Sequence, residues 1–227
     1  MSLKVIAFDA DDTLWVNEPY FQEVEQKFCE LLSPYLSHHT LSQELFKTEI
    51  NNLSIYGYGI KGYILSMIEA ALSISNHTIA PEVISKIIDY GKELIEKPIE
   101  IITEVAKTLE ILKGSYKLVV ATKGDLLDQH RKLHKSGLGH YFHHIEVMSD
   151  KKEADYTKLL QRLEVQPEQF IMVGNSLKSD ILPVLAIGAR AIYVPFHITW
   201  AHEKVDYKVE HYNFTEIKSI SEILKLI

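Results

Sequence analysis

The sequence predicts an α/β protein: a Rossmann-like, doubly wound parallel sheet with an all-helical cap domain inserted after the first strand. An apolar run at residues 3–8 reads as the first strand, and about 80 residues with only helical spacing follow it. From Pro98 onward, short apolar runs alternate with helical patterns. We therefore expect a discontinuous core domain, 1–16 and 98–227, and a helical cap domain, 17–97.

The first strand contains four apolar residues in a row, which suits a strand buried on both faces. The helices of the insertion follow from apolar residues at helical spacing. Asn17 is the expected N-cap of the first of them, with Pro19 in its first turn. The expected helices are 17–37, 41–55, 59–75 and 81–97.

Beyond Pro98, alternating helices and strands predict a parallel sheet covered on both faces. Ser219 and Glu222 have the spacing of a capping box, which predicts a short helix at the end of the chain. The expected elements are helix 100–113, strand 116–121, helix 125–136, strand 144–148, helix 153–164, strand 169–173, helix 177–187 and strand 190–194.

Composition excludes several classes of function. The 227 residues are 46% hydrophobic with a net charge of -7, and lysines and arginines do not cluster, so nucleic acid is not an expected partner. No apolar run has the length of a signal peptide or a membrane span. Cys29 is the single cysteine, which excludes an internal disulfide. We expect a cytoplasmic protein without a membrane partner, and its oligomeric state stays open.

Reactive side chains follow four of the expected strands. Asp9 and Asp11 come directly after the first strand, and the period of two places them on the same side of the chain. Open α/β sheets bind ligands at the carboxyl ends of their strands, so these side chains are expected to share one site. The other members of this group are Thr13, Thr122, Lys123, Lys151, Lys152, Asn175 and Asp180.

Together these segments resemble the haloacid dehalogenase superfamily, whose members are mostly phosphohydrolases. The resemblance covers nearly the whole chain, and four motifs occur in the family's order. Asp9-x-Asp11-x-Thr13 is the most specific motif, followed by Gly174-Asn175-Ser176-x-x-x-Asp180. The resemblance implies a Mg²⁺-dependent phosphohydrolase that acts on a small phosphorylated metabolite through an aspartyl-phosphate intermediate.

Within this resemblance, Asp9 is the expected nucleophile, and Asp11 the general acid and then the general base. Thr122 and the amide after it are expected to hold the phosphoryl oxygens. Thr13 and Lys123 are expected to bind the substrate.

The resemblance also implies that Mg²⁺ lies between Asp9, Asp180 and the backbone carbonyl of Asp11. Asn175 stands where many relatives carry an aspartate, so it is expected to orient a metal-bound water and to weaken metal binding somewhat.

The family's active-site lysine should hold the nucleophile and the phosphate, and this chain offers two candidates, Lys151 and Lys152. We select Lys151 because it is nearer the end of the strand. Neither is followed by the proline that often comes next in relatives.

The insertion also contains a glycine- and tyrosine-rich segment, Tyr56–Tyr63, in which Lys61 is a candidate substrate-binding residue. The segment is equally compatible with a helix–helix turn that packs its tyrosines.

Three other functions compete with this one. A phosphomutase differs from a phosphatase mainly in the acceptor of the phosphoryl group, and no residue separates the two. A dehalogenase needs neither a metal nor a second, proton-donating aspartate, so Asp11 and Asp180 argue against it. A phosphate-binding regulatory protein with weak catalysis is compatible with Asn175. The pattern does not identify the substrate.

Overall fold

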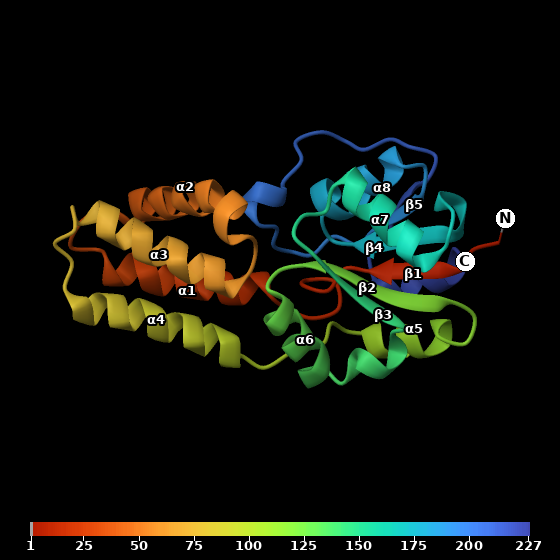
Figure 1. The fold of residues 1–227 in the computed structure, drawn as a ribbon, viewed down its shortest axis with the longest axis horizontal. Coiled ribbons are helices and arrows are strands. Elements are labelled where there is room, and N and C mark those ends of the chain that lie inside the picture. Colours follow the sequence, from red (N-terminus) through yellow and green to blue (C-terminus); the bar gives the residue numbers. More distant parts are fainter. Residues whose placement is uncertain (1) are drawn as a thin grey trace. The chain divides into compact units, whose positions relative to one another are not determined.

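The computed structural model describes residues 2–227, which divide into two compact units (Figure 1). The α/β unit comprises the chain up to Glu18 together with Ile99–Lys123 and Gln129–Ile227. The helical unit comprises Pro19–Pro98 and Gly124–Asp128. The short Gly124–Asp128 segment, expected in the core, thus groups with the helices.

The α/β unit contains, among the described residues, one sheet of six parallel strands in the order β3-β2-β1-β4-β5-β6. The predicted fold class is therefore confirmed. The strands are β1 (Val5–Phe8), β2 (Lys117–Lys123), β3 (His144–Met148), β4 (Phe170–Gly174), β5 (Arg190–Tyr193) and β6 (Phe214–Glu216). The sequence did not predict β6, because a three-residue edge strand leaves almost no periodic signal.

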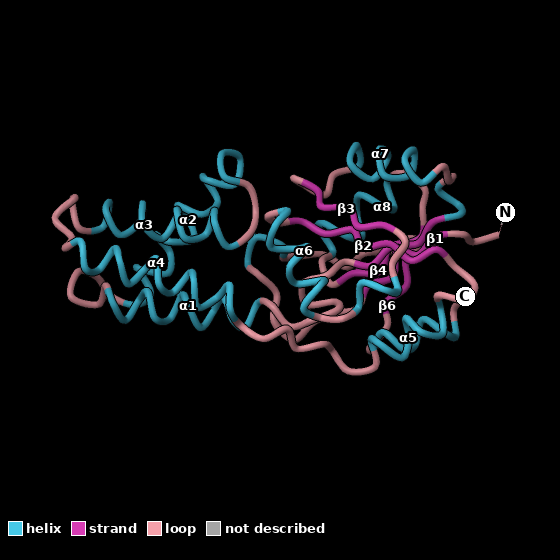
Figure 2. The backbone as a smooth tube through the Cα atoms, turned by 60° about the horizontal axis from the view of Figure 1, so that its bottom comes forward, coloured by secondary structure: helices cyan, strands magenta, loops and turns pink. Residues whose placement is uncertain are grey.

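Side chains of each central strand alternate between two apolar layers. Ile6 and Phe8 pack into one layer with Leu109, whereas Val5 and Ala7 pack into the other with Tyr156. Figures 1 and 2 show α7 and α8 on one face of the sheet and α5 on the other. Burial on both faces explains why these strands read as continuous apolar runs. The helices are α5 (Val105–Leu112), α6 (Leu126–Lys135), α7 (Glu153–Leu163) and α8 (Leu182–Ala186).

Two predicted helices of this unit differ from the structure. The one expected from residue 100 begins at Val105, because Ile101 pairs with Trp15 in an isolated bridge and Glu104 has a φ of 68°. The one expected at 177–187 is divided into a π-helical turn, Leu177–Ile181, and α8. Pro183, near the start of α8, has no amide hydrogen to continue the preceding turn.

The end of the chain forms a 3₁₀ helix, Ile220–Lys225. The predicted capping box is wrong, because the Ser219 side chain makes no capping hydrogen bond and instead lies 3.0 Å from the Ser221 hydroxyl.

The helical unit contains the four predicted helices, but the first, expected at 17–37, ends at Leu31. They enclose a separate apolar core that includes Phe28, Leu45, Met67 and Ile87. Their bounds are α1 (Glu18–Leu31), α2 (His38–Tyr56), α3 (Ile60–Ile74) and α4 (Pro81–Glu96). No helix among residues 2–227 combines the length and the apolar character needed to span a bilayer.

The predicted role of Asn17 as a helix cap is wrong. Its side-chain oxygen accepts a hydrogen bond from Lys132 at 2.8 Å. The Asp12 carboxylate instead accepts from the backbone amides of Asn17 and Glu18, at 2.8 and 3.0 Å. Asp12 therefore satisfies the first amide of α1, that of Glu18, and the amide that precedes it.

Candidate active site

Two buried carboxylates share one buried ammonium group at the carboxyl ends of the central strands. Lys151 Nζ lies 2.5 Å from Asp9 Oδ1 and 2.6 Å from Asp180 Oδ1. Burial raises the pKa of Asp9 to about 7, although Lys151 acts to lower it. Burial opposes the charge of Lys151, but the two carboxylates outweigh it and raise the Lys151 pKa above its ordinary value. The raised pKa favours the ammonium form of Lys151 between the two acids.

The sheet brings these three residues together from distant parts of the sequence. Asp9 follows β1, and its amide donates to the Val173 carbonyl oxygen of β4 at 2.8 Å. Lys151 follows β3, and Asp180 lies in the π-helical turn after β4. Parallel strands place all these ends at one edge of the sheet.

Gly174 allows Asp180 to approach β4 closely. A Cβ at Gly174 would lie 2.2 Å from Asp180 Oδ2, closer than any real contact. The same oxygen accepts a hydrogen bond from the Ser176 amide at 3.0 Å. The glycine is thus required by the position of the carboxylate rather than by a positive φ.

Asp11 is held by donors from two segments. Trp15 Nε1 and Lys132 Nζ donate to its Oδ1 at 2.7 and 2.9 Å, and Gln129 Nε2 donates to its Oδ2 at 2.9 Å. The sequence analysis missed Gln129 and Lys132, which lie on α6. Their spacing of three residues places them on the same helix face, but nothing in the local pattern points to Asp11.

Asn175 connects two of the expected metal ligands. The Asn175 side-chain amide is oriented so that its nitrogen faces hydrogen-bond acceptors. This nitrogen lies 3.1 Å from Asp9 Oδ2 and 3.2 Å from the Asp11 carbonyl oxygen. Thr13 Oγ1, 3.2 Å from the same nitrogen, donates to Asp9 Oδ2 at 3.3 Å. Three oxygens of different residues therefore surround the Asn175 side-chain nitrogen.

Thr122 and Lys123 lie at the end of β2 with different partners. The Thr122 hydroxyl is 2.9 Å from Gln129 Nε2. Lys123 Nζ lies 2.5 Å from Glu203 and 2.8 Å from the Ser179 hydroxyl. Burial of Glu203 opposes its charge, but Lys123 and two serine hydroxyls lower the Glu203 pKa to about 2. The sequence analysis missed Glu203, which ends a short 3₁₀ helix, Ala201–Glu203, after β5.

The two remaining candidate lysines pair with other carboxylates. Lys152 is exposed and pairs with Asp150 at 2.9 Å. Lys61 belongs to the helical unit, where its ammonium is 3.0 Å from both carboxylate oxygens of Asp125. A Cβ at Gly59 would lie 2.9 Å from the Asp125 amide, so this glycine permits a close approach of the backbone.

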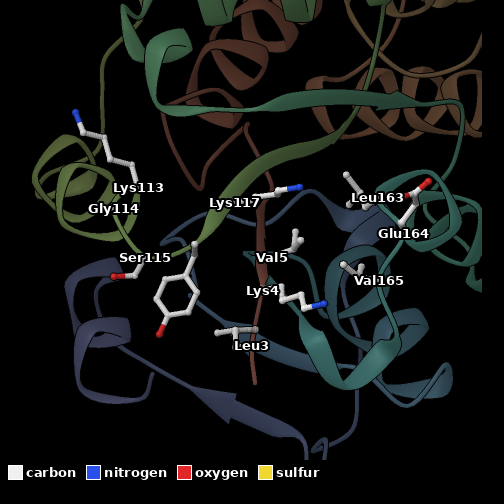
Figure 3. Close-up of a pocket in the computed structure, with 11 residues that line it drawn as sticks. Leu3, Lys4, Val5, Lys113, Gly114, Ser115, Lys117, Leu163, Glu164 and Val165 are labelled. Atoms are coloured by element: carbon white, nitrogen blue, oxygen red, sulfur yellow. The ribbon is translucent and has the colours of Figure 1, made fainter. Parts of the chain in front are cut away.

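A hollow of about 440 Å³ lies at the amino-terminal ends of β1 and β2, at the other end of these strands (Figure 3). Lys4 and Lys117 extend to the same side of β1 there. None of the sequence-predicted site residues lines this hollow.

Comparison with known proteins gives the family. A model of haloacid dehalogenase-like hydrolases matches residues 3–188, most of the chain. The chain belongs to this hydrolase family. The predicted resemblance is therefore confirmed, and the protein is an enzyme of the hydrolase class.

Within the family, the chain is similar to a solved haloacid dehalogenase-like hydrolase from Xanthomonas campestris. The identity is 37% and the TM-score 0.87, over 97% of this chain and 88% of that one. A curated relative from Pyrococcus furiosus, named glyceraldehyde 3-phosphate phosphatase, is 27% identical over 98% of this chain and 93% of its own length. A relative of the same name from Methanothermobacter thermautotrophicus is 28% identical over 52% of this chain and 54% of its own.

Proposed function

We propose that the protein hydrolyses the phosphate monoester of a small metabolite through a phosphorylated Asp9. The observation that carries the proposal is the Asp9 carboxylate, held by Lys151 with Asp11 two residues away. An attacking carboxylate, a proton-transfer group and a fixed cation are the groups that this reaction needs. The names of the two curated relatives support a phosphorylated substrate.

The reaction has two steps. An Asp9 carboxylate oxygen bonds to phosphorus as the bond from phosphorus to the leaving oxygen breaks, and Asp11 gives that oxygen a proton. A water molecule then attacks the phosphorus, loses a proton to Asp11 and breaks the bond to Asp9, which releases inorganic phosphate. Lys151 and Thr122 hold the charged phosphoryl oxygens in both steps.

The donor chemistry of the site fits Mg²⁺. Asp9 Oδ2 and the Asp11 carbonyl oxygen, which both lie within 3.2 Å of the Asn175 side-chain nitrogen, would form with Asp180 an all-oxygen donor set of the kind that Mg²⁺ prefers. No group of three His, Cys, Asp or Glu side chains among residues 2–227 is arranged to hold a metal, so the set depends on two carboxylates and a backbone carbonyl. Bound there, Mg²⁺ offsets the negative charge of a phosphate beside these carboxylates.

The helical unit is proposed as the cap domain of this enzyme, expected at 17–97, which restricts access to bulky substrates. Lys61, whose ammonium pairs with Asp125, is a proposed substrate contact within the cap. A cap that restricts access implies a small substrate.

The test is hydrolysis of p-nitrophenyl phosphate and glyceraldehyde 3-phosphate by the purified protein, with Mg²⁺ or with EDTA, measured as released inorganic phosphate. Asp9→Asn should abolish activity, while Asp89→Asn, a change of an exposed aspartate in the helical unit, should not. Unchanged turnover by Asp9→Asn would overturn the proposal. Transfer of phosphate to a second hydroxyl, without release, would identify a mutase.

A further inference from the structure

Two residues of α6 reach the proposed proton-transfer group. Gln129 and Lys132 are three residues apart, so their side chains lie on the same face of the helix. Both are buried, at 2% and 8% exposure. A buried ammonium and a buried amide are costly unless they are hydrogen-bonded, and both use Asp11 as a partner.

The Asp11 carboxylate receives donors on both of its oxygens. Lys132 Nζ and Trp15 Nε1 bind Oδ1, at 2.9 and 2.7 Å, and Gln129 Nε2 binds Oδ2 at 2.9 Å. An aspartate side chain rotates about two single bonds, and hydrogen-bond donors on both carboxylate oxygens define both of its torsion angles. The carboxylate is thus held in one direction.

Gln129 also connects Asp11 to the end of β2. The same nitrogen lies 2.9 Å from Thr122 Oγ1 and 2.6 Å from the Lys123 carbonyl oxygen. Its own side-chain oxygen is buried and has no hydrogen-bond partner. The amide is therefore oriented for its donor contacts, at the cost of an unsatisfied acceptor.

We propose that Lys132, assisted by Gln129, is a positioning residue that sets the direction of the Asp11 carboxylate during turnover. The proposal rests on the proposed function, in which Asp11 moves a proton. Proton transfer requires hydrogen-bond reach and alignment, so a carboxylate free to rotate reacts more slowly even when substrate binds equally well. Loss of Lys132 should lower kcat and leave KM nearly unchanged.

The test is a double-mutant cycle of Lys132→Met and Asp11→Asn, with kcat and KM measured for p-nitrophenyl phosphate. Alone, Lys132→Met should lower kcat about 10- to 100-fold. In the Asp11→Asn background the further loss of kcat should be much smaller, because the proposed effect on proton transfer acts through Asp11. An equal loss in both backgrounds, or a wild-type kcat for Lys132→Met, would overturn the inference.

Matched variants separate positioning from folding. Lys135→Met, a change of an exposed lysine on the same helix, should keep wild-type kcat. Lys132→Arg retains charged donors and should recover part of the lost rate. If Lys132→Met does not fold, Gln129→Leu carries the same prediction in the same cycle, and thermal unfolding verifies its fold.

Failure of the proposed function would look different. Asp11→Asn would then retain wild-type kcat. The cycle would then contain no loss of kcat at Asp11 with which an effect of Lys132→Met could be coupled. If Asp11→Asn is impaired while Lys132→Met and Gln129→Leu are not, the proposed function stands and the positioning role alone is overturned.

Discussion

Lys151 Nζ and Asp180 Oδ1 lie 2.6 Å apart, and both side chains are 1% exposed. Asp9 adds a second carboxylate to the same ammonium, so this cluster carries one more negative than positive charge when all three groups are ionised. The next residue, Lys152, has a side chain that is 77% exposed. Adjacent lysines in the sequence thus have opposite environments, and substitutions at the two positions should differ sharply.

Lys151→Met should abolish activity and destabilise the protein by about 3–5 kcal/mol, because it leaves two buried carboxylates without their cation. Lys152→Met should leave the free energy of unfolding nearly unchanged, since its ion pair is exposed. Urea unfolding and phosphate release measure the two effects. Equal effects of the two substitutions would contradict this assignment of the active-site lysine.

Gly174→Ala should displace Asp180, because the new methyl group would occupy the position of Asp180 Oδ2. The displaced carboxylate loses its bonds to Lys151 and to the Ser176 amide. We expect a destabilisation of about 2–4 kcal/mol and a loss of activity. Gly114→Ala is the control, since no atom lies within 4 Å of a Cβ there. Wild-type stability and activity of Gly174→Ala would show that the turn adapts at little cost.

Asn175→Asp should have opposite effects with and without Mg²⁺. A carboxylate at this position lies close to Asp9 Oδ2 and the Asp11 carbonyl oxygen, and its charge repels theirs in the metal-free protein. With Mg²⁺ the same charge strengthens binding of the cation. Thermal unfolding should therefore give a lower Tm than wild type in EDTA and a larger increase of Tm on addition of Mg²⁺. The prediction fails if the increase is no larger than in wild type.

Glu49, in α2, should make the helical unit less stable as the pH rises. Burial, with a contribution from the nearby Glu25, raises the Glu49 pKa to about 7. A carboxyl group with a raised folded-state pKa contributes stability that is complete below its unfolded pKa and is lost as the pH rises through about 7. Glu49→Gln should therefore stabilise the protein by about 1–3 kcal/mol near pH 8 and by little near pH 4. Urea unfolding at the two pH values measures this, and a pH-independent effect would refute the assignment.

Much of the fold was predictable because its physical causes are local. Strands buried on both faces, such as β1 and β4, produce continuous apolar runs, and amphipathic helices such as α4 produce helical spacing. The edge strand β6 and the division of the helix at 177–187 were missed. Both depend on pairing or on interrupted backbone hydrogen bonds, which periodicity does not record.

The sequence by itself determined the family, the order of the elements and the carboxylates after the first and fourth strands, because strand ends and motif spacing are properties of neighbouring residues. Only the tertiary structure decided which lysine is buried between Asp9 and Asp180, and that Lys132, Gln129 and Glu203 join the candidate site. These residues contact partners about 80 to 140 positions away. Their environments arise from desolvation and from charges that only the folded chain brings together.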